Sequence, residues 1–106
     1  MNGETAGRPW TDSGAPLFSV SQAADMLGVE QAFLRRVDSH GLVSPARTEG
    51  RQRRYSGDDL TALQGVMSLV DEGLTLAGVR RVLELQAEVD ELKATIRDLK
   101  ASSVRR

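Results

Sequence analysis

Residues 17–40, LFSVSQAADMLGVEQAFLRRVDSH, decide the fold of this chain. Ser21 is placed to cap a helix, because its hydroxyl can accept hydrogen bonds from the free amides of the first turn. Small apolar residues then follow at helical spacing: Ala23, Ala24 and Leu27. Gly28 can adopt the positive φ at which a short helix ends. The stretch therefore predicts a short helix that stops at a glycine.

A second helix is predicted over residues 30–40, directly after the glycine turn. Its inner side carries Phe33, Leu34 and Val37. Two short helices joined by a tight turn that contains glycine are typical of a helix-turn-helix. The spacing alone leaves a generic helical hairpin as an alternative.

Residues 41–56 cannot continue the helix, because two glycines and a proline interrupt them. Leu42 and Val43 predict one short strand, and Tyr55 predicts a second. Between the strands the sequence TEGRQ forms a loop, with Gly50 available for the turn. We therefore expect a β-hairpin wing with a basic tip.

Two further helices follow the wing. The first spans residues 58–73 and is capped by Ser56 or Asp58. Its apolar residues recur at helical spacing: Leu60, Leu63, Val66, Met67 and Val70. The second spans residues 75–86 and is capped by Thr75. Its expected core residues are Leu76, Val79 and Leu83.

Residues 85–101 carry a different pattern. Apolar residues recur there at steps of 4, 3, 4 and 3, which is the a/d pattern of a coiled coil. They are Leu85, Val89, Leu92, Ile96 and Leu99. A single helix of this length is only marginally stable in water. Its apolar stripe is narrower than the face that a helix buries against a domain core, and is typical of a helix that pairs with another helix. We predict a homodimer joined by these five residues, with a helix folded back on its own domain as the alternative.

The composition limits the class of protein. A chain of 106 residues suits one small domain with an appendage. The absence of cysteine removes disulfides, zinc ribbons and thiol chemistry. No apolar run reaches the length of a membrane span, and the N-terminus lacks the apolar centre of a signal peptide. We expect a soluble cytoplasmic protein that does not contact a membrane.

We divide the chain into four parts. Residues 1–16 are rich in glycine and proline and show no apolar period, which predicts a disordered arm. The helix-turn-helix with its wing and following helices occupies residues 17–84. The coiled-coil helix occupies residues 85–101, and a short tail occupies residues 102–106.

The formal net charge of -1 hides a strongly basic stretch. Between residues 34 and 56, arginines outnumber the two acids, Asp38 and Glu49. These arginines are Arg35, Arg36, Arg47, Arg51, Arg53 and Arg54. Because they lie on a helix and on the hairpin that follows it, they can meet the phosphates that flank a major groove. The pattern predicts double-stranded DNA as a partner, with a solvated basic face as the alternative.

Catalysis has little support in the sequence. His40 is the one histidine, and it lies at a helix end before a glycine, where capping is the expected role. Asp58 and Asp59 stand at a helix start, where they complement the helix dipole. The chain has no phosphate-binding glycine loop and no spacing typical of metal ligands. We therefore predict no enzymatic activity, no catalytic residue, no metal and no cofactor.

Four motifs resemble the DNA-binding domain of the MerR family of bacterial transcription regulators, and most of all its heat-shock-repressor branch. They are LR in the second helix, D-x-x-GL-V-x-P-x-R after it, RRYS-x-x-D at the end of the hairpin, and G-x-x-L-x-G-V-R near the start of the last helix. The similarity runs from about residue 18 to residue 85, and the coiled-coil stretch agrees with it.

The resemblance implies a mainly α, winged helix-turn-helix fold whose second helix enters the major groove. It also implies a dimer with an antiparallel coiled coil, bound to an inverted-repeat operator, and more often a repressor than an activator. By position, Arg35 matches the family's groove-facing arginine, and Tyr55 matches the tyrosine that anchors the wing. The positions that meet phosphate are Arg47, Arg53 and Arg54. With Arg36 and Arg51 from the same stretch, these residues form the predicted DNA-binding set.

Three positions depart from the family pattern. The family usually has a small hydroxyl residue at Phe33 and an aromatic residue at Val37, and often an arginine at Ser39. An alternative is therefore a protein-interaction module that binds another regulator or RNA polymerase, with Phe33 and Val37 as its outward apolar contact. Since the chain lacks cysteines and an added sensor domain, we do not expect ligand sensing; regulation is expected to come from a protein co-regulator, from the protomer concentration or from competition for DNA.

Overall fold

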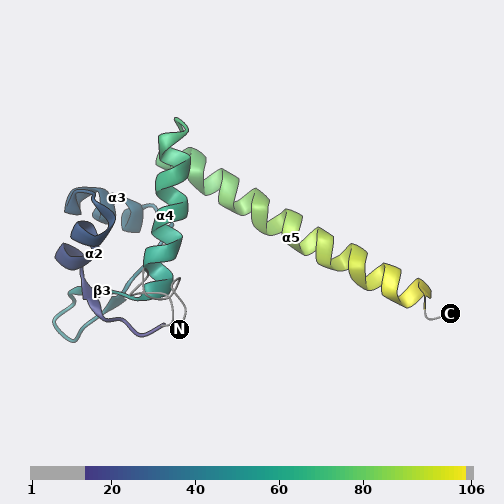
Figure 1. The fold of residues 1–106 in the computed structure, drawn as a ribbon, viewed down its shortest axis with the longest axis horizontal. Helices are drawn as coiled ribbons and strands as arrows, with labels where there is room; N and C mark the ends of the chain where they lie inside the picture. Colours follow the sequence, from purple (N-terminus) through teal and green to yellow (C-terminus); the bar gives the residue numbers. More distant parts are fainter. Residues whose placement is uncertain (1–13, 105–106) are drawn as a thin grey trace, which may run out of the picture.

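The computed structural model describes residues 14–104, so most of the predicted arm and the last two residues of the predicted tail lie outside it. The described chain forms a small domain of helices and sheet, from which one long helix extends (Figure 1). This mainly α, winged helix-turn-helix arrangement confirms the predicted fold class. The elements are β1 (Phe18–Ser19), α2 (Val20–Leu27), α3 (Gln31–Ser39), β2 (Ala46–Arg47), β3 (Arg53–Tyr55), α4 (Gly57–Asp71) and α5 (Leu76–Val104).

The first helix begins two residues earlier than the sequence predicts, because Ser19 and not Ser21 is its cap. The Ser19 hydroxyl accepts from the amide of Gln22 at 3.1 Å, and Oε1 of Gln22 accepts from the amide of Ser19 at 2.9 Å. Each side chain thus accepts a hydrogen bond from the backbone amide of the other residue, and this reciprocal arrangement is a capping box. The predicted end is confirmed, since Gly28 closes the helix with a φ of 72°.

A three-stranded antiparallel sheet replaces the expected two-stranded hairpin. β3 lies in the middle, with β1 on one side and β2 on the other. Phe18 lies opposite Tyr55 in one pair, and Arg47 lies opposite Arg53 in the other. The additional strand β1 directly precedes α2, so the sheet fixes the start of the helix-turn-helix to the base of the wing.

The predicted strand at Leu42 and Val43 is wrong. Gly41 has a φ of 70°, and the amide of Leu42 donates to the carbonyl of Val37 at 3.2 Å, which closes the C-terminus of α3. The amide of Leu42 is therefore used by the helix end and not by a strand. The strand β2 begins only after Pro45.

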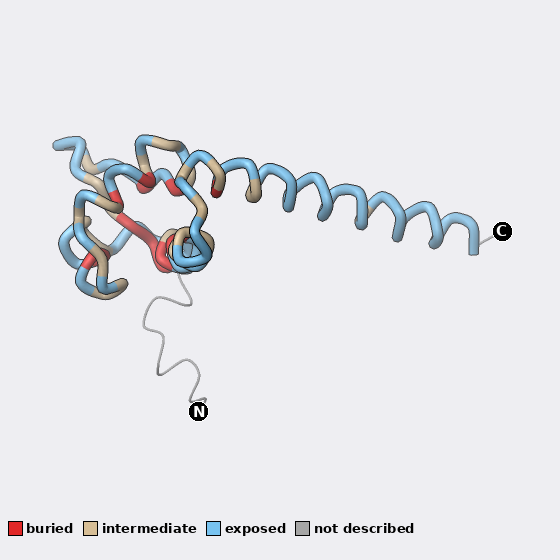
Figure 2. The backbone as a smooth tube through the Cα atoms, turned by 90° about the horizontal axis from the view of Figure 1, so that it is seen from above, coloured by how far each residue is buried: buried red, intermediate tan, exposed pale blue. Residues whose placement is uncertain are grey.

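The core lies between the sheet, the helices α2, α3 and α4 and the first turns of α5, where the buried segments gather in Figure 2. Its largest fully buried side chains are Tyr55, Leu34, Leu60, Leu63, Val37, Val66 and Val79. The core is therefore aliphatic around one tyrosine.

Ser56 is the cap of α4, because its hydroxyl accepts from the amide of Asp59 at 3.0 Å and the Asp59 carboxylate accepts from the amide of Ser56 at 2.9 Å.

The two segments predicted over residues 75–86 and 85–101 form the single helix α5. Thr75 caps it as expected, since its hydroxyl accepts from the amide of Gly78 at 3.1 Å. Beyond its first turns, α5 leaves the domain and stays exposed along its length (Figures 1 and 2). The alternative of a helix folded back on its own domain is therefore wrong. None of the helices among residues 14–104 is long and apolar enough to span a membrane.

Candidate nucleic-acid interface

The helix α3 buries one face and exposes its arginines on the other. Leu34 and Val37 lie in the core, whereas Arg35 and Arg36 are exposed. One guanidinium nitrogen of Arg35 donates to the side-chain oxygen of Gln31, one turn earlier, at 3.2 Å. The guanidinium of Arg36 lies 5.8 Å from the centre of the Phe33 ring, within the range of a cation–π contact. The second helix therefore presents two cations to solvent, as the sequence predicts.

The wing ends in a tight turn that holds Arg51 in a left-handed conformation. The amide of Thr48 donates to the carbonyl of Gln52 at 2.9 Å, and the amide of Arg51 donates to the carbonyl of Thr48 at 2.8 Å. The positive φ of the turn falls at Arg51, at 67°, and not at Gly50 as expected. Glycine adopts this conformation at lower cost than any residue with a Cβ. The chain therefore keeps an arginine where the backbone would favour glycine.

Asp38 of α3 joins the wing to the second helix. Its Oδ2 accepts from Nη2 of Arg47 and from Nε of Arg53, both at 2.8 Å. The three side chains are 11%, 46% and 22% exposed respectively, so the carboxylate is the most deeply placed of them. One carboxylate therefore holds one arginine from each strand of the wing. The sequence analysis did not identify this residue as part of the site.

A basic hollow of about 380 Å³ lies where α2, α3 and the wing meet. Its lining residues are Ser19, Val20, Arg35, Arg51, Gln52 and Arg53. Arg35 comes from the second helix and Arg51 from the wing turn, and neither forms an ion pair within residues 14–104. The N-terminus of α2 also opens here, with the partial positive charge of a helix start. The fold thus gathers positive charge from separate elements around one concave surface.

Arg54 and Tyr55 lie apart from this hollow. Side chains alternate along a strand, so Arg54 points to the face of the sheet opposite to Arg53 and Tyr55. Tyr55 is buried, and its hydroxyl has no hydrogen-bond partner within the described chain. Burial raises the pKa of the Tyr55 phenol, and this outweighs the opposing effect of the Arg53 guanidinium; the carboxylate of Asp38 acts in the same direction as burial. The position fits a tyrosine that anchors the wing from the core side.

The phenylalanine variant Tyr55→Phe should be more stable than the wild type. A buried hydroxyl without a partner costs about 1–3 kcal/mol, so we expect a gain of about 1 kcal/mol and a rise of several degrees in the thermal midpoint. Because the pKa of the Tyr55 phenol is raised in the folded state, the wild type keeps its full stability below the unfolded pKa of about 10 and loses part of it as the pH rises through the folded value. Thermal unfolding at neutral pH and above pH 10 tests this: the variant should lack that alkaline loss, and lower stability at neutral pH would contradict the prediction.

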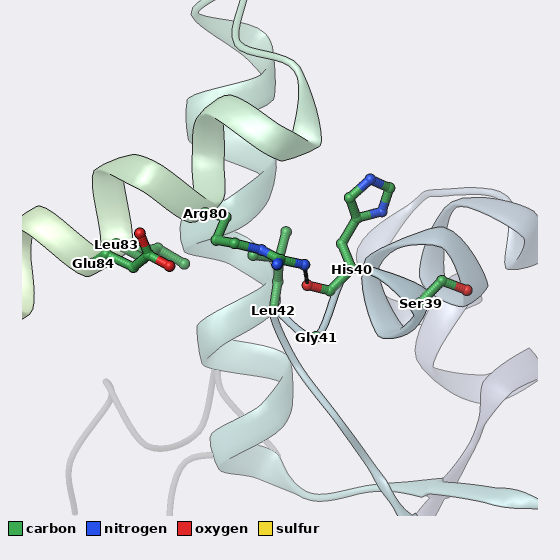
Figure 3. A pocket seen from close by; sticks show the side chains of 7 residues that line it. All are labelled: Ser39, His40, Gly41, Leu42, Arg80, Leu83 and Glu84. Carbon is green, nitrogen blue, oxygen red and sulfur yellow. Dashed lines mark hydrogen bonds between the residues drawn. The ribbon is translucent and has the colours of Figure 1, made fainter.

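The C-terminal end of α3 is also tied to α5. A guanidinium nitrogen of Arg80 donates to the carbonyl of His40, which is the C-cap residue of α3 (Figure 3). Nδ1 of His40 donates to the carbonyl of Arg36 at 2.9 Å, so the imidazole caps the helix as predicted. This contact sets the long helix against the helix that carries Arg35. Arg80 is a second positioning residue that the sequence pattern did not identify.

The predicted dimerisation residues lie on the exposed part of α5. Leu92 and Leu99 are 61% and 65% exposed, and the other three are about half exposed. All five stay exposed in the described chain, and Figure 2 shows that this part of α5 extends away from the other elements. A row of large apolar side chains in water is typical of a protein–protein contact.

The MerR HTH regulatory-protein family model matches residues 18–86. The chain belongs to the MerR family. This agrees with the motifs of the second helix, the wing and the start of α5, and with the heat-shock-repressor branch that they resemble most. MerR proteins are regulators, so family membership also confirms the prediction that the chain is not an enzyme.

Individual MerR relatives extend this result. The chain is 46% identical over 88 residues to "Putative heat shock protein HspR" of Streptomyces coelicolor, covering 82% of this chain and 58% of that protein. It is 33% identical over 95 residues to the HTH-type transcriptional regulator GlnR of Bacillus anthracis, covering 87% and 74%. It shares its fold with HiNmlR, a MerR family regulator lacking the sensor domain, whose crystal structure is bound to promoter DNA. That likeness has a TM-score of 0.58 and 24% identity, and covers 78% of this chain and 79% of the other.

The structure also places the two apolar departures from the MerR pattern. Val37 is fully buried in the core. Phe33 packs against the edge of the core and lies beneath the guanidinium of Arg36. The outward apolar contact that the protein-interaction alternative requires is therefore absent at Val37.

Proposed function

We propose that this protein is a homodimeric, sequence-specific DNA-binding transcription regulator that represses from an inverted-repeat operator. In this proposal, residues 17–84 bind DNA and residues 85–101 of α5 pair two copies. The helix α3 lies in the major groove with Arg35 toward the bases, and the wing lies along the backbone. The protein would act in the bacterial cytoplasm at the nucleoid, with a protein co-regulator as a possible partner in this proposal.

The convergence of charge on the basic hollow carries this proposal. Arg35 and Arg51 are sixteen positions apart in the sequence, yet they line the same surface beside the N-terminus of α2. Backbone phosphates bind well to a helix N-terminus flanked by guanidinium groups. Arg36 extends the same charged face along α3. A duplex whose backbone passes the hollow while its major groove receives α3 satisfies these groups together.

The exposed stripe of α5 supports the dimer. Its five apolar residues are spaced almost symmetrically about Leu92, so an antiparallel pair brings Leu85 opposite Leu99 and Val89 opposite Ile96. Two copies related by a two-fold axis would present two α3 helices to the two halves of an inverted repeat. Repression is proposed from the similarity to the heat-shock-repressor branch.

A salt titration of DNA binding tests the proposal. Apart from Arg35, three arginines of the basic stretch form no ion pair in the described chain, which gives about six phosphate contacts per dimer, so a plot of log affinity against log salt should have a slope of about -5. The probes are a duplex selected by the protein from a randomised pool and an unselected random duplex. We expect the selected duplex to bind at least about a thousandfold more tightly than the random one. If no duplex binds in a salt-dependent manner, the protein does not act through DNA.

A further inference from the structure

The contact between Asp38 and the wing has a role beyond simple packing. Arg47 and Arg53 lie directly opposite each other on β2 and β3. Their side chains therefore project from the same face of the sheet, where like charges that face each other are unfavourable. The single oxygen Oδ2 of Asp38 accepts from both guanidinium groups at 2.8 Å. The carboxylate lies between the two cations and relieves their repulsion.

The geometry of this triad separates two groups of arginines in the basic stretch. Arg47 and Arg53 already have an anionic partner within the protein. Arg35, Arg36 and Arg51 form no ion pair with any carboxylate of residues 14–104. A phosphate that approached the first group would have to compete with a carboxylate held in place by α3. A phosphate that approached the second group would not compete with a carboxylate of the described chain.

We propose that Asp38 is a positioning residue that determines specificity: it fixes the wing against α3 and withholds Arg47 and Arg53 from DNA phosphates. This rests on the proposed DNA-binding function and assigns roles within it. Phosphate contacts carry no sequence information, so two additional free arginines on each protomer would strengthen binding to every duplex alike. A wing fixed to α3 also fixes the distance between Arg51 and Arg35, and thereby the position of α3 in the groove.

The variant Asp38→Asn tests this in the full-length protein, with Glu49→Gln as the matched control. Both changes remove one negative charge from the basic stretch, but Glu49 is an exposed wing residue without an ion pair in the described chain. Releasing two arginines per protomer should make the salt slope of Asp38→Asn steeper by about 2 to 4, against less than about 1 for Glu49→Gln. Binding to the random duplex should tighten and discrimination in favour of the selected duplex should fall. Equal slopes in the two variants would overturn the proposal.

A second variant decides the matter even if Asp38→Asn folds poorly. Arg47 is about half exposed, so Arg47→Gln should fold normally. If Asp38 withholds Arg47, this change alone leaves the slope within about 0.5 of the wild-type value. Where Asp38→Asn folds normally, adding Arg47→Gln to it should reduce the slope by about 1 to 2. If Arg47→Gln alone reduces the slope by about 2, Arg47 contacts phosphate and the proposal is wrong. A wild-type protein that binds no duplex would instead remove the proposed function itself.

Discussion

Replacing Leu92 with glutamate should convert the protein to a monomer and reduce its affinity for operator DNA by roughly a hundredfold to ten-thousandfold. Leu92 lies at the centre of the apolar stripe on α5. In a symmetric pair of helices the central residue meets its own copy whether the helices run parallel or antiparallel, so two carboxylates would face each other in an apolar seam. Loss of pairing removes the gain of linking two half-site contacts, which is about 10² to 10⁴ in affinity.

The side chain of Leu92 is 61% exposed in the single chain, so the fold of the protomer should not depend on it. Ala87→Glu is the matched control, because it adds the same side chain to an exposed position of α5 outside the stripe. Sedimentation of both proteins, with helix content from circular dichroism, separates loss of pairing from loss of folding. A Leu92→Glu protein that remains a dimer would show that the stripe is not the dimer contact. A monomer with wild-type affinity would show that pairing does not contribute to DNA binding.

The helices of this protein could be predicted because their signals are local. Apolar residues at helical spacing identified α3, α4 and α5, and Gly28 and Thr75 correctly marked helix ends. The choice of Ser21 over Ser19 failed for a specific reason. Both serines precede the apolar positions, and only the glutamine three residues after Ser19 completes a capping box.

The sheet was harder to predict because its pairing is long-range. β1 has two residues, too few to show alternation, and its partner Tyr55 is 37 positions later in the sequence. Leu42 and Val43 have the composition of a strand, but the end of α3 takes up the amide of Leu42. Strand propensity depends on what the surrounding fold leaves available for pairing.

The candidate site was predicted in composition but not in arrangement. All six arginines of the basic stretch were identified, yet nothing local distinguishes Arg53, which is paired, from Arg51, which is not. The difference comes from Asp38, which lies nine positions before Arg47 and fifteen before Arg53. A lone acid in a basic stretch was the available signal, and only the fold shows which cations it holds. The same holds for Arg80, whose partner carbonyl lies forty positions earlier.

Removing both unpaired guanidinium groups from the basic hollow should weaken binding to every duplex by at least about a thousandfold, or roughly 4 kcal/mol. The double variant Arg35→Ala with Arg51→Gly takes away two cations per protomer and four per dimer. Of the two residues only Arg51 is a proposed phosphate contact, so the salt slope should become shallower by about 2. Glycine is the replacement at position 51 because the backbone there has a φ of 67°, which glycine adopts without strain. The thermal midpoint should therefore not fall, and any loss of binding reports the missing charge.

The double variant Arg81→Ala with Lys100→Ala is the matched control, since it removes the same net charge from exposed positions on α5. It should keep the wild-type salt slope, because counterion release depends on cations at the phosphates and not on the charge of the whole protein. The single variants Arg51→Gly and Arg35→Ala then distinguish the roles of the two arginines in the hollow. Arg51→Gly should weaken selected and random duplexes alike, whereas Arg35→Ala should weaken the selected duplex more, since a groove contact distinguishes bases and a backbone contact does not. If the hollow variant binds like the control, the DNA lies on another face of the domain.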